Sequence, residues 1–566
     1  MALKPDKKPW AFLDDYRGKD FNGIWPTIPE AFTISYKRFA KNPLFTAFAP
    51  KKLTFTYEEA YNKILDIAYY LVESGVKEGD RVGVSGKNSP EWALSYLAIS
   101  FSGAIVVPLD YSLKDAEMEH LMEFGGVTRL FIDAERIDKI NTPLLKEKIS
   151  LEENCKDHKY VLDLKGGKCE LPKAKCEDTA AILFTSGTTG VMLSHINLIS
   201  DCYVAQSNLK VVPEDVFYAI LPIHHAYTML AVFFETWCTG ASCVFGKKLV
   251  VTQILRELKE GKVTMFLAVP MLFNKMFAAL MDGVKKKGPF VNGFIHFLMS
   301  FSGFVKKVFK VNIGKHLFGF LLKKLSLDTN RICICGGGPL PASTFKGFNE
   351  LGIDFVQGYG LTETSPITHL NPVEAYIETS VGKILPGLEQ KIVDPDSDGN
   401  GVIYIKGSVV MQGYYHNEEA TAEVLSPDGW LNTGDVGHID SNGYLYLTGR
   451  AKNVIVTEGG KNVFPEEIED HFQLYDELDQ VCIVGYVVDK ATKSEGIRLI
   501  AHPSEKFAKA HSKEEVEARI NEIVKDVNKE LQSYKKITMV TVVDEPLEMT
   551  STKKIKRFVV AKKYAL

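Results

Sequence analysis

Between about Thr54 and Leu370, short apolar runs alternate with segments patterned as amphipathic helices. Such runs are too short for core helices and suit strands that are buried on both faces. Because strands that alternate with helices are joined by crossovers, the pattern predicts parallel sheets with helices on both faces, and the segment is long enough for two sheets. The runs are RVGVSG at 81–86, GAIVVPLD at 103–110, TRLFID at 128–133, MFLAVP at 265–270 and RICICG at 331–336.

The pattern changes after about Ser380, where short alternating runs such as EQKIVD and VIYIKG are separated by DSDGNG and SNG turns. Turn residues between alternating runs are typical of antiparallel hairpins, so we expect a small β-barrel at about 380–449. Helix and strand patterns return after Arg450. The sequence therefore predicts an α/β fold with a large N-terminal domain (1–450), made of two doubly wound parallel-sheet subdomains plus the barrel, and a smaller, mobile α+β C-terminal domain (451–566).

The charge balance limits the partners of the chain. Lys and Arg number 67 against 71 Asp and Glu, a net charge of −4, so no overall field attracts nucleic acid and we expect no nucleic-acid partner. The nine cysteines form no CxxC pair, which favours a reducing compartment. The N-terminus lacks the apolar region of a signal peptide, so we expect a cytoplasmic protein.

The first motif with chemical content is AILFTSGTTG at 181–190, in which an apolar strand runs directly into small hydroxyl residues and glycines. Without bulky side chains, successive backbone N–H groups and hydroxyls can converge on a phosphate. The motif is not a Walker loop. Taken alone, a Gly/Thr-rich turn is more often only a turn.

Two further glycine-rich turns follow predicted strands, at Gly336–Gly338 and in QGYGLTETSP at 357–366. Ligands of open α/β sheets collect at the carboxyl ends of strands. In the second turn, Tyr359 offers a flat face for a base, Thr362 a hydroxyl, and Glu363 an oxygen ligand for Mg²⁺ beside phosphates. The alternative for Glu363 is a solvated loop carboxylate or a helix cap.

Together these motifs resemble the adenylate-forming superfamily of acyl- and aryl-CoA synthetases, nonribosomal adenylation domains and beetle luciferases. The resemblance covers about 180–557 in family order, and KNSPEWALSYLAISFSGAIVVPLD at 87–110 extends it toward the N-terminus. The matching segments are FTSGTTG (phosphate loop), LPIHHAY (acid substrate), GGGPLP and GYGLTETSP (adenine and Mg-ATP), DGWLNTGD (ribose), GRAKNVIVTEGGKNVFPEEIE (interdomain hinge) and STKKIKR (adenylation lysine).

The resemblance implies roles for residues of this sequence in binding nucleotide. Tyr359 would stack on adenine, Thr362 would contact the α-phosphate, and Glu363 would hold magnesium together with Thr185. Asp435 would accept hydrogen bonds from the ribose hydroxyls, with Arg450 nearby. The polyphosphate would lie on Thr185, Ser186, Gly187, Thr188, Thr189 and Gly190, and the remaining nucleotide-binding positions are Gly336, Gly337, Gly338, Gln357, Gly358 and Gly360.

It also implies a catalytic set of Lys554, Glu363, Thr362 and His225. Lys554 would bridge the acid and the α-phosphate during adenylation, and His225 would border the acid. The C-terminal domain would then rotate about a hinge at Lys452 and bring Gly459 and Gly460 to the thiol tunnel. Lys553 occupies the usual glycine position of the terminal motif, so a slip of one residue in this assignment stays open.

One step of the phosphate loop is missing. The family loop continues as TSGTTGxPKGV, whereas here Gly190 is followed directly by Val191. The lysine of that step helps to hold the outgoing phosphates. Either the protein lacks the step or the recorded sequence has lost four residues, and a genuine loss would slow or abolish adenylation.

The terminal motifs GGKNVFPEEIE and TKKIKR are most similar to the long-chain branch of the acyl-CoA synthetases. The implied function is ATP- and Mg²⁺-dependent activation of a long-chain fatty acid to acyl-AMP, followed by thioester formation with coenzyme A. A long acyl tail contributes about 0.8 kcal/mol per buried methylene and needs no polar recognition. Two alternatives are an acyl-AMP ligase that loads a carrier protein and a non-catalytic binder of nucleotide or acyl chains.

The segment 290–325 interleaves phenylalanines with lysines. This combination fits a helix pair at a lipid interface, which would place the protein peripherally at the inner membrane face. The other interpretation is two ordinary packed helices whose lysines reach solvent. The residues are Phe294, Phe297, Phe301, Phe304, Phe309, Phe318, Phe320, Lys306, Lys307, Lys310, Lys315, Lys323 and Lys324.

Overall fold

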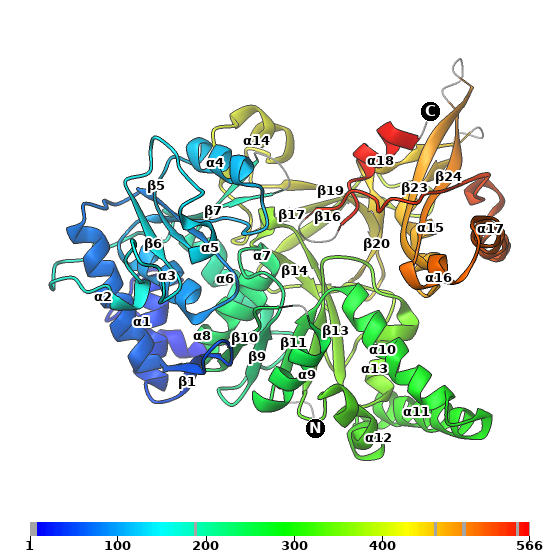
Figure 1. The fold of residues 1–566 in the computed structure, drawn as a ribbon, viewed down its shortest axis with the longest axis horizontal. Coiled ribbons are helices and arrows are strands. Elements are labelled where there is room, and N and C mark those ends of the chain that lie inside the picture. Colours follow the sequence, from blue (N-terminus) through cyan, green and yellow to red (C-terminus); the bar gives the residue numbers. More distant parts are fainter. Residues whose placement is uncertain are drawn as a thin grey trace. The chain divides into compact units, whose positions relative to one another are not determined.

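The computed structural model describes residues 8–185, 189–248, 250–457, 461–489, 494–550 and 554–564 (Figure 1). Within these ranges the chain forms two compact units. The first contains the residues up to 338 together with 342–390 and 405–431, and the second contains 339–341, 391–404 and the residues from 432 onward. The predicted domain boundary near Arg450 stays a prediction.

One sheet of the first unit has seven strands in the order β18-β8-β7-β4-β3-β5-β6. The five strands from β7 to β6 are parallel; β8 pairs antiparallel with β7, and β18 pairs antiparallel with β8. The bounds are β3 (Arg81–Ser85), β4 (Ile105–Pro108), β5 (Val127–Ile132), β6 (Glu147–Ser150), β7 (Thr179–Phe184), β8 (Gly190–Ser194) and β18 (Gly413–Tyr414).

The other sheet of the first unit runs in the order β15-β14-β13-β12-β11-β9-β10-β1-β2. Its six strands from β13 to β1 are parallel, and antiparallel strands flank them on both sides. The bounds are β1 (Pro43–Ala47), β2 (Leu53–Thr56), β9 (Val216–Ala219), β10 (Ser242–Phe245), β11 (Met265–Ala268), β12 (Ile332–Cys335), β13 (Asp354–Gly360), β14 (Ile367–Leu370) and β15 (Gly382–Ile384).

Helices of the first unit follow the strands. All residues of α3 (Pro90–Phe101) are buried, as expected for a helix without a polar face. Helix α1 (Ile28–Phe39) begins at a capping box between Thr27 and Glu30. The others are α2 (Tyr57–Glu73), α4 (Asp115–Phe124), α5 (Ala134–Ile137), α6 (His195–Ala205), α7 (Ala226–Thr228), a π-helical turn (Met229–Phe234), α8 (Glu235–Thr239), α9 (Val251–Glu260), α10 (Pro270–Lys285), α11 (Pro289–Phe309), α12 (Gly314–Leu322), α13 (Ala342–Glu350) and α14 (Glu418–Val424).

Short strands and a small α+β body make up the second unit. The predicted SNG hairpin joins β19 to β20, which pair antiparallel. Strands β23 and β24 also pair antiparallel, β25 adds in parallel, and α17 contacts β25. The bounds are β16 (Glu389–Val393), β17 (Gly401–Lys406), β19 (Leu431–Ile439), β20 (Tyr444–Arg450), β21 (Ile455–Val456), β22 (Asn462–Val463), α15 (Pro465–Glu469), β23 (Leu478–Asp489), β24 (Ser494–Pro503), α16 (Glu505–Ala510), α17 (Lys513–Glu530), β25 (Met539–Val542) and α18 (Arg557–Tyr564).

The predicted fold class is confirmed: mixed, mainly parallel sheets covered by helices form the larger part, and a smaller α+β part follows. The five apolar runs that led to this prediction lie in β3, β4, β5, β11 and β12. Among the helices in the described ranges, none has the length and apolar character needed to cross a bilayer.

Candidate active site

The predicted phosphate loop connects β7 to β8, which pair antiparallel. Phe184 pairs with Gly190, so five residues connect the two strands. The backbone N–H of Thr185 donates to the carbonyl oxygen of Thr189 at 3.1 Å, which closes the turn. Ser186, Gly187 and Thr188 lie outside the described residues. The loop is therefore anchored at both ends by strand pairing.

Glu363 lies in a helical turn, η5 (Thr362–Thr364), that follows β13. Its Oε1 accepts a hydrogen bond from the Tyr414 hydroxyl at 3.0 Å, and its backbone carbonyl accepts from the N–H of Met411 at 2.9 Å. Tyr414 is in β18 and pairs with Val191 in β8, the strand that leaves the phosphate loop. The carboxylate predicted to hold Mg²⁺ is thus connected through one tyrosine to the phosphate loop's own strand.

Tyr359 lies near the end of β13, opposite His369 on β14, with ring centroids 5.7 Å apart. His369 is fully buried, and its Nε2 is 2.6 Å from Oε1 of Gln390. Burial lowers the pKa of His369 to about 4, so this ring is neutral near pH 7. The half-buried face of Tyr359 therefore has an uncharged neighbour, which suits stacking on a neutral base.

Glycine is required beside Tyr359. A Cβ on Gly360 would lie 1.6 Å from the carbonyl oxygen of Pro366, a distance that no side chain can adopt. Gln357 and Gly358 precede it in β13, and Gln357 pairs with Cys335 at the end of β12. The two predicted nucleotide turns therefore begin at neighbouring strand ends.

Gly336–Gly338 form the turn after β12. A Cβ on Gly336 would lie 2.8 Å from the ring of Tyr227, and Gly337 has a φ of +82°. The Tyr227 hydroxyl donates to the carbonyl oxygen of Ile334 at 3.4 Å. Tyr227 belongs to the LPIHHAY segment, so the structure brings the predicted adenine turn and the predicted acid segment into direct contact.

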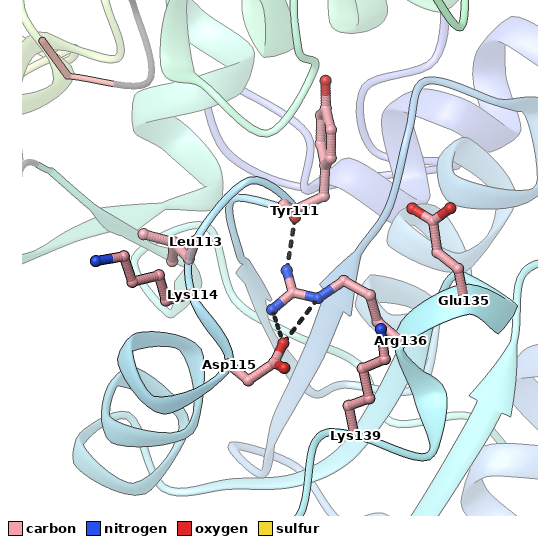
Figure 2. Close-up of a pocket in the computed structure, with 7 residues that line it drawn as sticks. All are labelled: Tyr111, Leu113, Lys114, Asp115, Glu135, Arg136 and Lys139. Atoms are coloured by element: carbon pink, nitrogen blue, oxygen red, sulfur yellow. Dashed lines mark hydrogen bonds and ion pairs between the residues drawn. The ribbon is translucent and has the colours of Figure 1, made fainter.

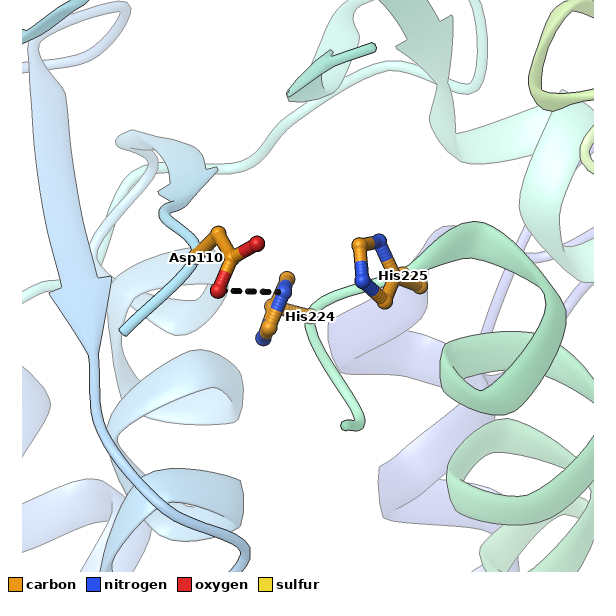
Figure 3. Close-up of side chains that lie close together, drawn as sticks. All are labelled: Asp110, His224 and His225. Carbon is orange, nitrogen blue, oxygen red and sulfur yellow. Dashed lines mark ion pairs between the residues drawn. The ribbon is translucent and has the colours of Figure 1, made fainter. Parts of the chain in front are cut away.

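His225 has two neighbours that the sequence analysis did not single out, Asp110 and His224 (Figure 3). Asp110 follows β4 of one sheet, and both histidines follow β9 of the other. One donor atom from each residue lies within 4.8 Å of the other two, and Nε2 of His224 is 3.5 Å from Oδ1 of Asp110. Two imidazoles and one carboxylate form a donor set that could hold a divalent cation such as Zn²⁺. No sequence signal connects Asp110 with His225, because more than a hundred residues separate them.

A hollow of about 490 Å³ lies elsewhere in the first unit and contains none of the predicted site residues (Figure 2). Arg136 crosses it, bound to the carboxylate of Asp115 and to the carbonyl oxygen of Tyr111. Its lining residues are Tyr111, Leu113, Lys114, Asp115, Glu135, Arg136 and Lys139. Because the guanidinium already has its partners, we assign this hollow no role.

In the second unit, Asp435 and Arg450 face each other across the β19–β20 hairpin. Oδ1 of Asp435 is 2.8 Å from Nε of Arg450, and the Asp435 side chain is largely buried. The Asp435 N–H donates to Oγ1 of Thr433 at 3.1 Å. A buried, oriented carboxylate of this kind is a suitable acceptor for a sugar diol.

Lys554 is held by Thr550 on both sides of its backbone: its N–H donates to the Thr550 Oγ1 at 3.1 Å, and its carbonyl oxygen accepts from the Thr550 N–H at 2.8 Å. Desolvation by surrounding protein atoms lowers the pKa of its ammonium; the charge of Arg450 acts in the same direction and that of Asp435 in the opposite one. Lys452 is exposed in a short 3-10 turn, Ala451–Asn453. Lys553, Gly459 and Gly460 lie outside the described residues.

Comparisons with known proteins cover nearly all of this chain. The model for "AMP-binding enzyme" matches residues 36–415, and the model for "AMP-binding enzyme C-terminal domain" matches 452–566. A Rattus norvegicus protein named long-chain-fatty-acid–CoA ligase ACSBG2 is 28% identical over an alignment of 498 positions, which covers 78% of this chain and 72% of that protein.

A second relative is named for another acyl acceptor. The Arabidopsis thaliana long-chain-fatty-acid–acyl-carrier-protein ligase AEE15, chloroplastic, is 25% identical over an alignment of 631 positions, which covers 95% of this chain and 86% of that protein. Among solved structures, the O-succinylbenzoate coenzyme A synthetase (MenE) of Bacillus subtilis, in complex with ATP and magnesium, has a TM-score of 0.73 at 22% identity, over 93% of this chain and 98% of that one. This likeness shows a shared fold.

Proposed function

The chain belongs to the AMP-binding enzyme family, within the adenylate-forming superfamily, and on that basis we propose that it activates a long-chain fatty acid with ATP and then transfers the acyl group to coenzyme A. The observation that carries the proposal is the connection of Glu363, through Tyr414, to the strand leaving the phosphate loop. A carboxylate fixed beside that loop is what an Mg²⁺-dependent reaction of a nucleoside triphosphate needs.

The first step brings a carboxylate toward the α-phosphorus of a polyanion, so the site must offset like charges. Glu363 and Thr185 would hold Mg²⁺, which neutralises phosphate charge when bound. Thr362 donates to the α-phosphate, and the Lys554 ammonium bridges the acid and that phosphate. A well-placed donor of this kind contributes about 3 kcal/mol in a site from which water is excluded. Pyrophosphate leaves and acyl-AMP remains.

The second step is attack of a thiol on acyl-AMP, which forms the thioester and releases AMP, and a lysine that bridges the acid and the α-phosphate would have to be withdrawn before the thiol attacks. We propose rotation of the C-terminal part about Lys452, which withdraws Lys554 and brings the Gly459–Gly460 segment toward the thiol. The exposed turn at Lys452 suits this role, because a hinge needs only a few element-terminal residues that change φ and ψ.

A long acyl chain is favoured by the apolar segment that follows His225 in the chain. The π-helical turn Met229–Phe234, which begins one residue after the LPIHHAY segment, is buried throughout and has only apolar side chains. Burial of an alkyl chain contributes about 0.8 kcal/mol per methylene, so recognition does not require a charged pocket. The name of the rat relative agrees with this acid class.

The acceptor has a second candidate, the phosphopantetheine thiol of a carrier protein. The observation in its favour is the name of the Arabidopsis relative, which matches 95% of this chain. Supplying the purified protein with acyl-AMP and either coenzyme A or a phosphopantetheinylated carrier separates the two. Faster transfer to coenzyme A supports our proposal, and transfer to the carrier alone replaces it.

The test of the first step is acid-dependent exchange of pyrophosphate into ATP, measured across acids of increasing chain length with Mg²⁺ present. We expect exchange and AMP formation to be greatest for long-chain acids. If aryl acids supported faster exchange than long-chain acids, the assignment of a fatty acid as substrate would be wrong. Zero exchange with every acid, also after the xPKG step is restored, would leave a non-catalytic binder.

A further inference from the structure

Helix α11 buries one face and leaves a second apolar face in solvent. Its buried positions recur at helical spacing and pack toward α10 and α13: Ile295, Met299, Ser302 and Lys306. The outer positions recur with the same spacing, and their exposed fractions run from 48% to 84%: Phe290, Phe294, Phe297, Phe301, Phe304 and Val308. We call these six residues the aromatic face. A helix on the surface of a protein normally shows polar side chains outward, so this face departs from the rule.

Neighbouring residues extend the aromatic face. Phe309 is 63% exposed at the end of α11, and Phe320 of α12, which contacts α11, is 58% exposed. Two residues of the predicted interleaved set point inward instead: Phe318 is fully buried, and Lys306 forms a buried ion pair with Asp354 at 2.7 Å. Ordinary packing thus explains those two and leaves the outer phenylalanines unexplained. In Figure 1 the helices α10, α11 and α12 stand together at one edge of the first unit.

The charged residues within the segment that contains α11 and α12 are all basic. Residues 283–327 contain nine lysines and neither Asp nor Glu, although the whole chain is slightly acidic. Lys285, Lys286 and Lys287 are exposed directly before α11, and Lys310 is exposed directly after it. Lys307 forms an ion pair with Glu378, and Lys310 donates to the carbonyl oxygen of Glu374. Exposed lysines therefore lie at both ends of the aromatic face.

We propose that the aromatic face docks on an anionic lipid bilayer, with α11 lying in the interface plane. The phenylalanine rings enter the boundary between headgroups and acyl chains, and the lysines at the two helix ends contact anionic headgroups. Helix α11 has 21 residues, so about 30 Å of helix is available for contact. The surface binds the membrane without spanning it.

Charge complementarity favours an anionic bilayer over a second copy of the chain as the partner of the aromatic face. A symmetric dimer through α11 would be isologous, so two antiparallel copies would set Lys285–Lys287 of one against Lys310 of the other. Like charges facing each other across an interface oppose association. A bilayer with acidic headgroups supplies the opposite charge at both helix ends.

The experiment is co-sedimentation of the full-length protein with vesicles of phosphatidylcholine alone or mixed with phosphatidylserine, at low and high ionic strength. We expect binding to the mixed vesicles that weakens with salt, because the lysine contribution is screened. Phe294→Gln, Phe297→Gln and Phe301→Gln together should lower the partition coefficient by about tenfold or more. The matched control is Phe558→Gln, since Phe558 is 78% exposed in the other unit.

A second pair of variants tests the charges without touching the aromatic residues. Lys285→Gln with Lys286→Gln should lower binding to the mixed vesicles, and Lys51→Gln with Lys52→Gln, at another exposed pair, should not. Equal binding by all variants would overturn the proposal. So would a wild-type dimer in sedimentation velocity that dissociates in the triple Phe variant, because the face would then join two copies. The assay contains neither ATP nor acid, so its failure leaves the proposed activity untouched.

Discussion

The hydroxyl of Tyr414 donates to Oε1 of Glu363 across 51 residues of sequence, at 3.0 Å. Tyr414 is one of only two residues in β18, yet its backbone pairs with Val191 directly beyond the phosphate loop. The Tyr414 side chain therefore holds the carboxylate that we propose as a magnesium ligand at a fixed place relative to the strand that leaves the phosphate loop. In that arrangement Tyr414 is a positioning residue, because it acts through Glu363.

Glu363→Gln should weaken the use of Mg-ATP without unfolding the protein, since glutamine still accepts the Tyr414 hydrogen bond. We expect the magnesium concentration for half-maximal pyrophosphate exchange to rise about tenfold or more, because a neutral amide is a poor Mg²⁺ ligand. Titration of exchange against Mg²⁺ at saturating ATP measures this. An unchanged magnesium dependence would remove Glu363 from the site.

Tyr414→Phe should produce a smaller shift in the same direction. A hydrogen bond to a charged group contributes about 1.5–3 kcal/mol, part of which orients the carboxylate. Combined with Glu363→Gln, the effect should be less than additive, because both changes act on one group. Tyr415→Phe, at the adjacent residue, is the control. Full additivity in the double variant would show that Tyr414 does not act through Glu363.

Lys554→Ala separates the two half-reactions. Adenylation should fall by about 10² or more, because the ammonium stabilises charge that develops at the α-phosphate. Transfer from supplied acyl-AMP to coenzyme A should stay within a few-fold, since the proposed rotation removes Lys554 before that step. Lys562→Ala, an exposed lysine of α18, serves as control. Equal loss in both half-reactions contradicts the assignment and would direct attention to Lys553.

Local patterns sufficed for most of the fold. The apolar runs at β3, β4, β5, β11 and β12 contain their own strand signal. The glycine-rich turn that follows the IDFV run likewise indicated that Tyr359 and Glu363 lie at the end of a strand, which is β13. Hydrophobic period and turn chemistry are properties of neighbouring residues, so a single sequence contains them.

Contacts between distant segments were not predictable in the same way. Strand β18 has two residues and hence no periodicity, so nothing in the sequence indicated that Tyr414 would reach Glu363. Asp110 follows β4 of one sheet and His225 follows β9 of the other, so these two residues lie close together only in the folded chain. Likewise, the spacing of phenylalanines in α11 predicted a helix but did not indicate which of them face solvent.

Acid should destabilise the protein in part through His195. Its Nδ1 accepts a hydrogen bond from the N–H of Ile28 at 3.2 Å, and burial lowers its pKa to about 4 from 6.5. Between these values the unfolded chain binds the proton and the folded chain does not. The free energy of unfolding therefore falls as pH drops from about 6.5 to about 4, by up to about 1.4 kcal/mol per pH unit.

His195→Asn keeps an acceptor near Ile28 but does not titrate. We expect the urea midpoint of the variant to decline less than that of the wild type when the pH is lowered from 7 to 5, as followed by near-UV circular dichroism. His120→Asn is the matched control at an exposed histidine. If both variants decline in parallel with the wild type, His195 does not contribute to acid sensitivity.

The shortened phosphate loop gives the last prediction. Phe184 pairs with Gly190, and Val191 pairs with both Leu183 and Tyr414, so residues inserted after Gly190 must lengthen the turn without shifting the strands beyond it. Inserting Ala-Pro-Lys-Gly at this point should raise the exchange rate by about tenfold, because a lysine beside the outgoing phosphates offsets their charge. Ala-Pro-Gln-Gly has the same length without the charge, so a gain with both insertions would assign the defect to length alone. No gain with either would mean that other residues already compensate for the missing step.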